Sequence, residues 1–204
     1  MSGYSTINIR NNFPQVAAKL DTIGRDIGDK ALVRALNKTV DQGKTQMARQ
    51  ISREFRLSVG KAKERLTIHR AFKKGGVYHY QAKLEATRRG KGRAMNLIHF
   101  VENKVTLAEG RRRAKKGVLN QVHFQIKRAG GKKVIPGAFI GNKGRTLFIR
   151  TGKERLPIKA INTIDVPQMF NTRVLNAAVR KAMLASFQGN FNRELRAVTK
   201  GFAR

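Results

Sequence analysis

Apolar side chains recur about every four residues at both ends of the chain, and this spacing is lost in the middle. Near the N-terminus the apolar stripe comprises Leu32, Leu36, Val40, Met47, Ile51 and Phe55. Near the C-terminus it comprises Leu175, Val179, Met183, Phe187, Phe191 and Leu195. A spacing of four places each set on one face of an α-helix, so we predict helices over residues 13–56 and 167–200. The first is either one helix or two joined near Gly28, and the second has a candidate interruption at Gly189.

The middle of the chain, residues 66–161, is typical of short strands. Runs such as LTIHRAF, VYHYQAKLEA and TLFIR are rich in β-branched and aromatic residues, and turns of Gly, Asn and Lys separate them. We expect KKGG at 73–76 to turn a hairpin in which Phe72 faces Val77, and NLIHFVE to be a further strand. The order of elements predicts an α+β fold in which two long helices pack on one twisted antiparallel sheet. We expect a single domain over residues 1–204.

The charge of the chain indicates the kind of partner that it binds. The chain has 44 Lys and Arg residues against 12 Asp and Glu, for a formal net charge of +32. Such a surface repels itself and favours a polyanion, with nucleic acid as the first candidate, an acidic protein surface second and anionic lipid a distant third. No run approaches the roughly 18 apolar residues of a membrane span, and the N-terminus has no signal-peptide core, so we expect no membrane anchorage.

The cations concentrate in two glycine-spaced segments that we expect to be loops, residues 86–95 and 109–117. Glycine lets a backbone approach a phosphate closely, and a guanidinium group offers it two parallel donors. Aromatic residues do not interleave these loops, so phosphate contact without base reading is the better interpretation; the alternative is a solvated charge run that maintains solubility. The nucleic-acid-binding candidates, which include the AGGKK turn, are Arg88, Arg89, Lys91, Arg93, Arg111, Arg112, Arg113, Lys115, Lys116, Lys132 and Lys133.

The sequence offers little for catalysis. It has no cysteine, which excludes disulfides and thiolate metal sites. The four histidines lie in separate strand-like runs without ligand spacing, and no two carboxylates stand out as an acid and base pair. GNKGRT at 141–146 lacks the full spacing of a phosphate-binding loop and precedes a strand instead of a helix. We therefore predict no catalytic residue, no metal and no cofactor.

Several stretches resemble one known family. ALNKTVDQGKTQMARQISREF at 35–55, IPGAFIGNKGRTLFIRTGKERLPIKAI at 135–161 and VPQMF at 166–170 are similar to the minor tail protein Z family of tailed bacteriophages and prophages. ALNKT, PGAFI and RLPI are the most specific pieces. The likeness extends over residues 14–200. The basic segments in the middle resemble the family only in their general basic character.

The resemblance implies a structural virion protein that is not an enzyme. It would complete the head-proximal end of a long tail, after assembly in the host cytoplasm, and help join the tail to the head connector. It implies a homo-oligomeric ring, a hexamer to match tail symmetry, beside the tail terminator, tail tube and head-completion proteins. The basic loops would meet either acidic neighbours or phage DNA through its phosphates. Composition alone leaves open a ribosomal-type RNA-binding protein, because high charge and glycine-spaced Arg loops also suit ribosomal RNA.

Overall fold

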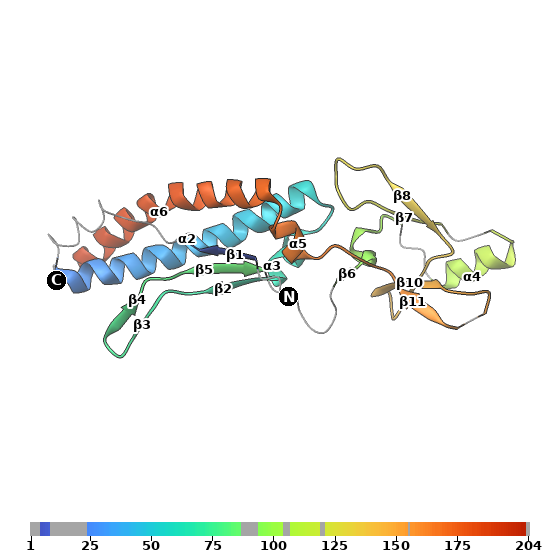
Figure 1. The fold of residues 1–204 in the computed structure, drawn as a ribbon, viewed down its shortest axis with the longest axis horizontal. Coiled ribbons are helices and arrows are strands. Elements are labelled where there is room, and N and C mark those ends of the chain that lie inside the picture. Colours follow the sequence, from blue (N-terminus) through green and yellow to red (C-terminus); the bar gives the residue numbers. More distant parts are fainter. Residues whose placement is uncertain are drawn as a thin grey trace.

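The chain is elongated, with a helical layer at one end and a β-rich part at the other (Figure 1). The computed structural model describes residues 5–8, 24–86, 94–103, 107–118, 121–154 and 156–202. The two longest helices, α2 (Arg25–Glu54) and α6 (Arg173–Phe202), run antiparallel in the helical layer. They confirm the two predicted helices, although residues 13–23 of the first prediction lie outside the described residues. The α+β class is also confirmed.

The two predicted stripes form the contact between α2 and α6. Their most deeply buried members are Leu36, Val40, Met47, Ile51, Val179, Met183, Phe187 and Phe191. Gly43 lies where α2 comes closest to Met183, because a Cβ atom at this position would overlap the Met183 Sδ atom and lie 2.7 Å from its Cε atom. Burial of these side chains supplies the main favourable free energy for the pair, since apolar surface removed from water contributes about 25 cal/mol per Å².

A polar cluster around buried Asn190 interrupts this apolar interface. Asn190 is 2% exposed, and its Nδ2 group donates to Thr39 Oγ1 at 3.0 Å and to Gln42 Oε1 at 2.9 Å. Every polar atom that two long helices bury must find a partner, and a shift of one helix along the other would break these bonds. The cluster therefore fixes the register of α2 against α6.

The helix break near the C-terminus does not fall at the glycine that the sequence suggested. Both α2 and α6 are continuous, through Gly28 and Gly189 respectively. The break falls at Asn171 and Thr172, which separate α6 from the short helix α5 (Val166–Phe170). A glycine inside a helix costs only about 1 kcal/mol, which the buried face of a helix this long offsets easily.

A small antiparallel sheet packs beside α2. Its strand order is β1 (Ser5–Asn8), β5 (Lys83–Ala86) and β2 (Leu66–His69), and the short helix α3 (Val59–Glu64) leads into β2. Leu66 and Leu84 are buried under this sheet. The sheet therefore contributes its inner face to the same core as the two long helices.

A hairpin of β3 (Phe72–Lys74) and β4 (Val77–His79) projects from this sheet (Figure 1). Its turn residues Gly75 and Gly76 have φ angles of 56° and 81°, as a type I′ turn requires. Phe72 therefore pairs with His79, and the expected pairing with Val77 is wrong. The sequence prediction centred the turn one residue too early because it counted Lys74 as a turn residue.

The β-rich part contains short strands in separate sheets, whereas the sequence predicted one twisted sheet. It has a β9–β10–β11 meander, a β7–β8 hairpin and a β6–β12 pair. No strand among the described residues exceeds five residues. Turns and short helices separate these strands, which therefore form several small sheets and not one. The bounds are β6 (Met95–Asn96), β7 (Gln121–Phe124), β8 (Lys133–Pro136), β9 (Phe139–Gly141), β10 (Thr146–Arg150), β11 (Ile158–Ala160) and β12 (Asn162–Thr163).

The expected strand NLIHFVE is instead a 3₁₀ helix, η1 (Leu97–Phe100). The Asn96 side chain caps it by accepting a hydrogen bond from Ile98 N at 3.0 Å. Leu97, Ile98 and Phe100 are all buried, a pattern that does not alternate as it would in a strand with one exposed face. Within the described ranges, no helix is both long and apolar enough to cross a membrane.

Candidate nucleic-acid interface

The basic segment predicted as a loop over 109–117 is mostly helical, because it forms α4 (Leu107–Lys115). Glu109 and Arg113 are four residues apart, and their side chains pair at 2.7 Å, an arrangement that stabilises a helical turn by about 0.2–0.5 kcal/mol. The sequence prediction gave too much weight to Gly110 and did not count this pair. The remaining candidate cations of the segment are exposed: Arg111, Arg112, Lys115 and Lys116.

Three of these four cations lie on α4, and Lys116 directly follows its last residue. Arg111 and Lys115 are four residues apart within the helix. Like charges at this spacing destabilise a helix by a few tenths of a kcal/mol per pair. In the part of the chain that the structure describes, none of the four has an ion-pair partner. The four cations therefore favour an external anion. Figure 1 places α4 at the end of the molecule farthest from α6.

The other predicted cations do not join this surface. Arg88, Arg89, Lys91 and Arg93 lie outside the described residues, as does most of the predicted loop 86–95. Lys132 and Lys133 lie where the loop after β7 enters β8. Figure 1 places that loop on the side of the β-rich part that faces α2, away from α4.

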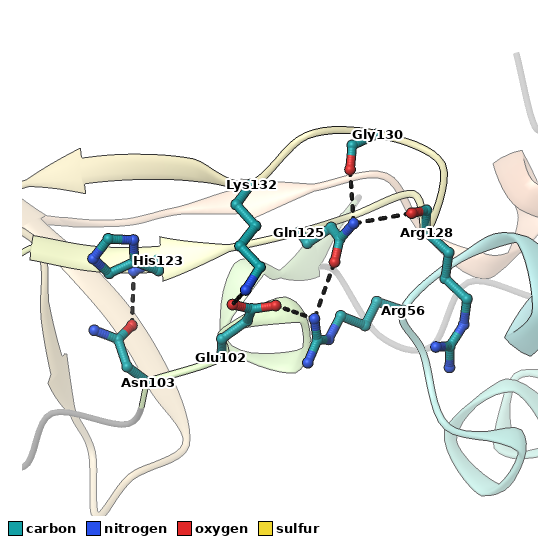
Figure 2. Close-up of polar contacts among 8 residues, drawn as sticks. All are labelled: Arg56, Glu102, Asn103, His123, Gln125, Arg128, Gly130 and Lys132. Carbon is teal, nitrogen blue, oxygen red and sulfur yellow. Dashed lines mark hydrogen bonds and ion pairs between the residues drawn. The ribbon is translucent and has the colours of Figure 1, made fainter.

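Lys132 takes part in an internal ion pair (Figure 2). Its Nζ atom lies 3.0 Å from Glu102 Oε2, and Arg56 Nη1 donates to the other oxygen of the same carboxylate. Arg56 also donates to Gln125 Oε1 at 3.0 Å. The Lys132 hydrogen bond and the charges of Arg56 and Lys132 hold the pKa of Glu102 below its ordinary value of 4.5. Lys132 is therefore a residue of the junction between the two parts of the molecule.

The same loop caps the C-terminal end of α2. Arg128 donates from its backbone N to Glu54 O and from its side-chain Nε to Ser52 O, both at 2.8 Å. Arg56 N donates to Ile126 O at 2.8 Å. The last carbonyl groups of a helix lack partners inside the helix and attract cations, so Arg128 satisfies both needs at once. This clamp joins the helical layer to the β-rich part.

A second cationic surface lies on the first turns of α6, where seven basic residues and one acid over 167–204 predict a cationic exposed face, although its residues are not among the predicted site residues. Arg173, Arg180 and Lys181 line a shallow hollow of about 530 Å³ together with the side chains of Asn171 and Asn176. The spacing of seven and eight residues between the cations places them on one face of the helix. This spacing is visible in the sequence, but Arg173 is seven residues away from the next cation of the set, so the three residues do not form a run of charge.

The described residues provide no evident catalytic or metal-binding arrangement. They contain no group of three or more His, Asp and Glu side chains that could hold a metal ion. His69 Nε2 lies 2.8 Å from Glu85 Oε2 across neighbouring strands, and His79 stacks on Phe72 with 4.6 Å between ring centroids. Both are ordinary contacts of sheet histidines.

Comparison with known proteins gives one positive result. The family model described as prophage minor tail protein Z (GPZ) matches residues 14–201, which confirms the resemblance of the stretches at 35–55 and 135–161. No curated protein and no solved structure matches the chain.

Proposed function

The chain belongs to the prophage minor tail protein Z family of structural phage tail proteins, and we propose that it completes the head-proximal end of the tail and helps join it to the head connector. The family match over residues 14–201 carries this proposal. It also favours a tail protein over the ribosomal-type alternative, although both accommodate a net charge of +32. Family members are not enzymes, so the function lies in contacts.

The contacts are of two kinds. Basic side chains on α4 meet the phosphates of DNA in the tail lumen, and the cations of α6 meet an acidic neighbour. The proposed partners are further copies in a hexameric ring, the tail terminator, the tail tube and the head-completion proteins. In this proposal residues 1–204 act as a single tail-completion domain.

Electron microscopy of tails assembled without this protein tests the placement. We expect tubes with an abnormal upper end that fail to join heads, and loss of infectivity that the wild-type protein restores. Complete and infectious particles in its absence would refute the proposal. Tails with a defect only at the distal tip would move the protein to the other end of the tube.

The DNA contact has its own test in the double change Arg111→Ser with Arg112→Ser. Arg113 is left in place because its ion pair with Glu109 supports the helix. Each lost phosphate contact lowers the slope of log K against log salt by about 0.9, so we expect the slope to fall by about 1.8. The matched control, Arg49→Ser with Arg53→Ser on the exposed side of α2, removes the same charge elsewhere. An equal loss of slope in both variants would show that α4 has no special role.

A further inference from the structure

A hollow of about 550 Å³ lies between the β7–β8 hairpin and the segment 161–164. Its walls are mostly apolar and come from three stretches of the chain, at 97, 124–135 and 161–164. The apolar lining residues are Leu97, Phe124, Ile126, Ile135, Ile161 and Ile164. Protein interiors are normally packed without such gaps, so a hollow of this size among aliphatic side chains has room for apolar groups of a ligand.

Strand β8 forms part of the wall of this hollow and has a free edge. Ile135 pairs with Val122 and Lys133 with Phe124, so Lys133 and Ile135 share the inner face of the hairpin, while Val134 points outward and is 44% exposed. Among the described strands β8 pairs with β7 alone. The opposite edge of β8 therefore offers backbone hydrogen-bonding groups to another extended chain, up to Pro136, which has no N–H group.

The rim of the hollow is cationic. Lys127 and Lys133 line it, and no acidic residue belongs to its described lining. The Lys127 side chain is 61% exposed and lies 3.8 Å from Glu54, a long pair that water screens strongly. Lys133 is exposed and has no ion pair within the described ranges. An occupant should therefore combine apolar side chains with carboxylates.

We propose that this hollow is the docking site for an extended, acidic segment of a neighbouring protein. An apolar side chain of that segment enters the hollow, a carboxylate meets Lys133, and its backbone runs along the free edge of β8. A nucleic-acid backbone does not fit the same surface, because the aliphatic walls would strip water from phosphates without replacing it. The identification of the neighbour as a tail protein rests on the proposed function, whereas the docking chemistry does not.

The test uses the full-length protein labelled at isoleucine methyl groups and a short peptide with the repeat Glu-Ser-Val-Ser, the Glu–Val peptide, which places Glu and Val on the same face of an extended strand. On titration we expect NMR shift changes at Ile135, Ile161 and Ile164, and none at Ile51, which is buried in the α2–α6 interface. Changes confined to other methyl groups, or no changes at all, would overturn the proposal. A peptide of Glu alone that produced the same changes would also overturn it, since the hollow would then add nothing to the general charge.

Two substitutions on the same strand give a matched comparison. Ile135→Glu puts a charge into the hollow and should weaken binding of the Glu–Val peptide about tenfold, and Val134→Glu, on the outer face, should change it less than about twofold. Equal loss in both variants refutes the site. If Ile135→Glu does not fold, the NMR shift changes at the isoleucine methyl groups of the wild-type protein still test the docking site. If the wild-type protein binds the peptide but tails assembled without the protein are normal, only the proposed function is refuted. If those tails are defective but the wild-type protein does not bind the peptide, only the docking site is refuted.

Discussion

Replacement of Gly43 by alanine tests how closely α2 and α6 approach each other. The new Cβ atom would overlap Met183 Sδ and lie 2.7 Å from its Cε and 2.9 Å from its Cγ. Met183 is 2% exposed, so its side chain can move aside only within the packed core. Either Met183 leaves its preferred rotamer or the helices separate, and both responses lower stability.

Two opposing effects determine how much Gly43→Ala changes the free energy of unfolding. Alanine is favoured over glycine inside a helix by about 1 kcal/mol. Overpacking a closely packed core costs about 1–3 kcal/mol. We therefore expect Gly43→Ala to lower the free energy of unfolding by about 0–2 kcal/mol, with the clash determining the sign.

Gly189 allows the effect of helix propensity to be measured apart from the effect of the clash. Gly189 lies inside α6, is exposed, and has no atom within 4 Å of the position that an added Cβ atom would take. Gly189→Ala should therefore raise stability by about 1 kcal/mol, through helix propensity alone. The difference between the two variants gives the clash, and we expect about 1–3 kcal/mol.

Urea unfolding followed by circular dichroism measures these differences, with the midpoints compared at a shared slope. Met183→Ala alone should cost about 2–5 kcal/mol by leaving a cavity. Combined with Gly43→Ala it should cost less than the sum of the two, because the added methyl group occupies part of that cavity. If Gly43→Ala stabilises the protein as much as Gly189→Ala does, the close approach of the helices is wrong.

Three further changes probe other contacts. Asn190→Ala removes the hydrogen-bond partner of buried Thr39, and we expect urea unfolding to show that the free energy of unfolding falls by about 1–3 kcal/mol. A much smaller decrease would show that water replaces the amide. Glu102→Gln removes a carboxylate whose pKa is lowered on folding, so the stabilisation is present above pH 4.5 and is lost as the pH falls below it. The variant should be less stable at pH 7 and lose less stability on acidification, and an unchanged acid profile would contradict the ion pairs. Asp165→Ala removes the capping box of α5, in which Gln168 is the reciprocal partner, and should lower the unfolding midpoint by the equivalent of about 0.5–2 kcal/mol. A Gln168→Ala variant that behaves like wild type would limit the effect to the Asp165 side chain.

The elements that the sequence predicted best are those with a long hydrophobic period. The stripes of α2 and α6 carry many repeats of one spacing, so the helices were predictable even though Gly43 and Gly189 weaken local propensity. The division of the sheet was not predictable, because strands of two to five residues contain too few alternations to define partners. The 3₁₀ helix η1 was missed for a related reason, since a short apolar run has no distinctive period.

The candidate site was predictable only in part. Charge density identified the cations of α4 but not the helix that carries them, which the Glu109–Arg113 pair helps to stabilise. Lys132 looked equivalent to Lys133 in sequence, and only the fold brings Glu102 to it from thirty positions away in the chain. Contacts between distant segments are set by topology, so a surface assembled from several elements cannot be deduced from local composition.

The clamp formed by Arg128 also affects how the protein could be divided. The final carbonyl groups of α2 receive their hydrogen bonds from a loop that belongs to the β-rich part. A fragment containing the helical layer alone would leave those groups to solvent and let the last turn fray. Engineers who wish to graft the β-rich part onto another scaffold would need to transplant the end of α2 along with it.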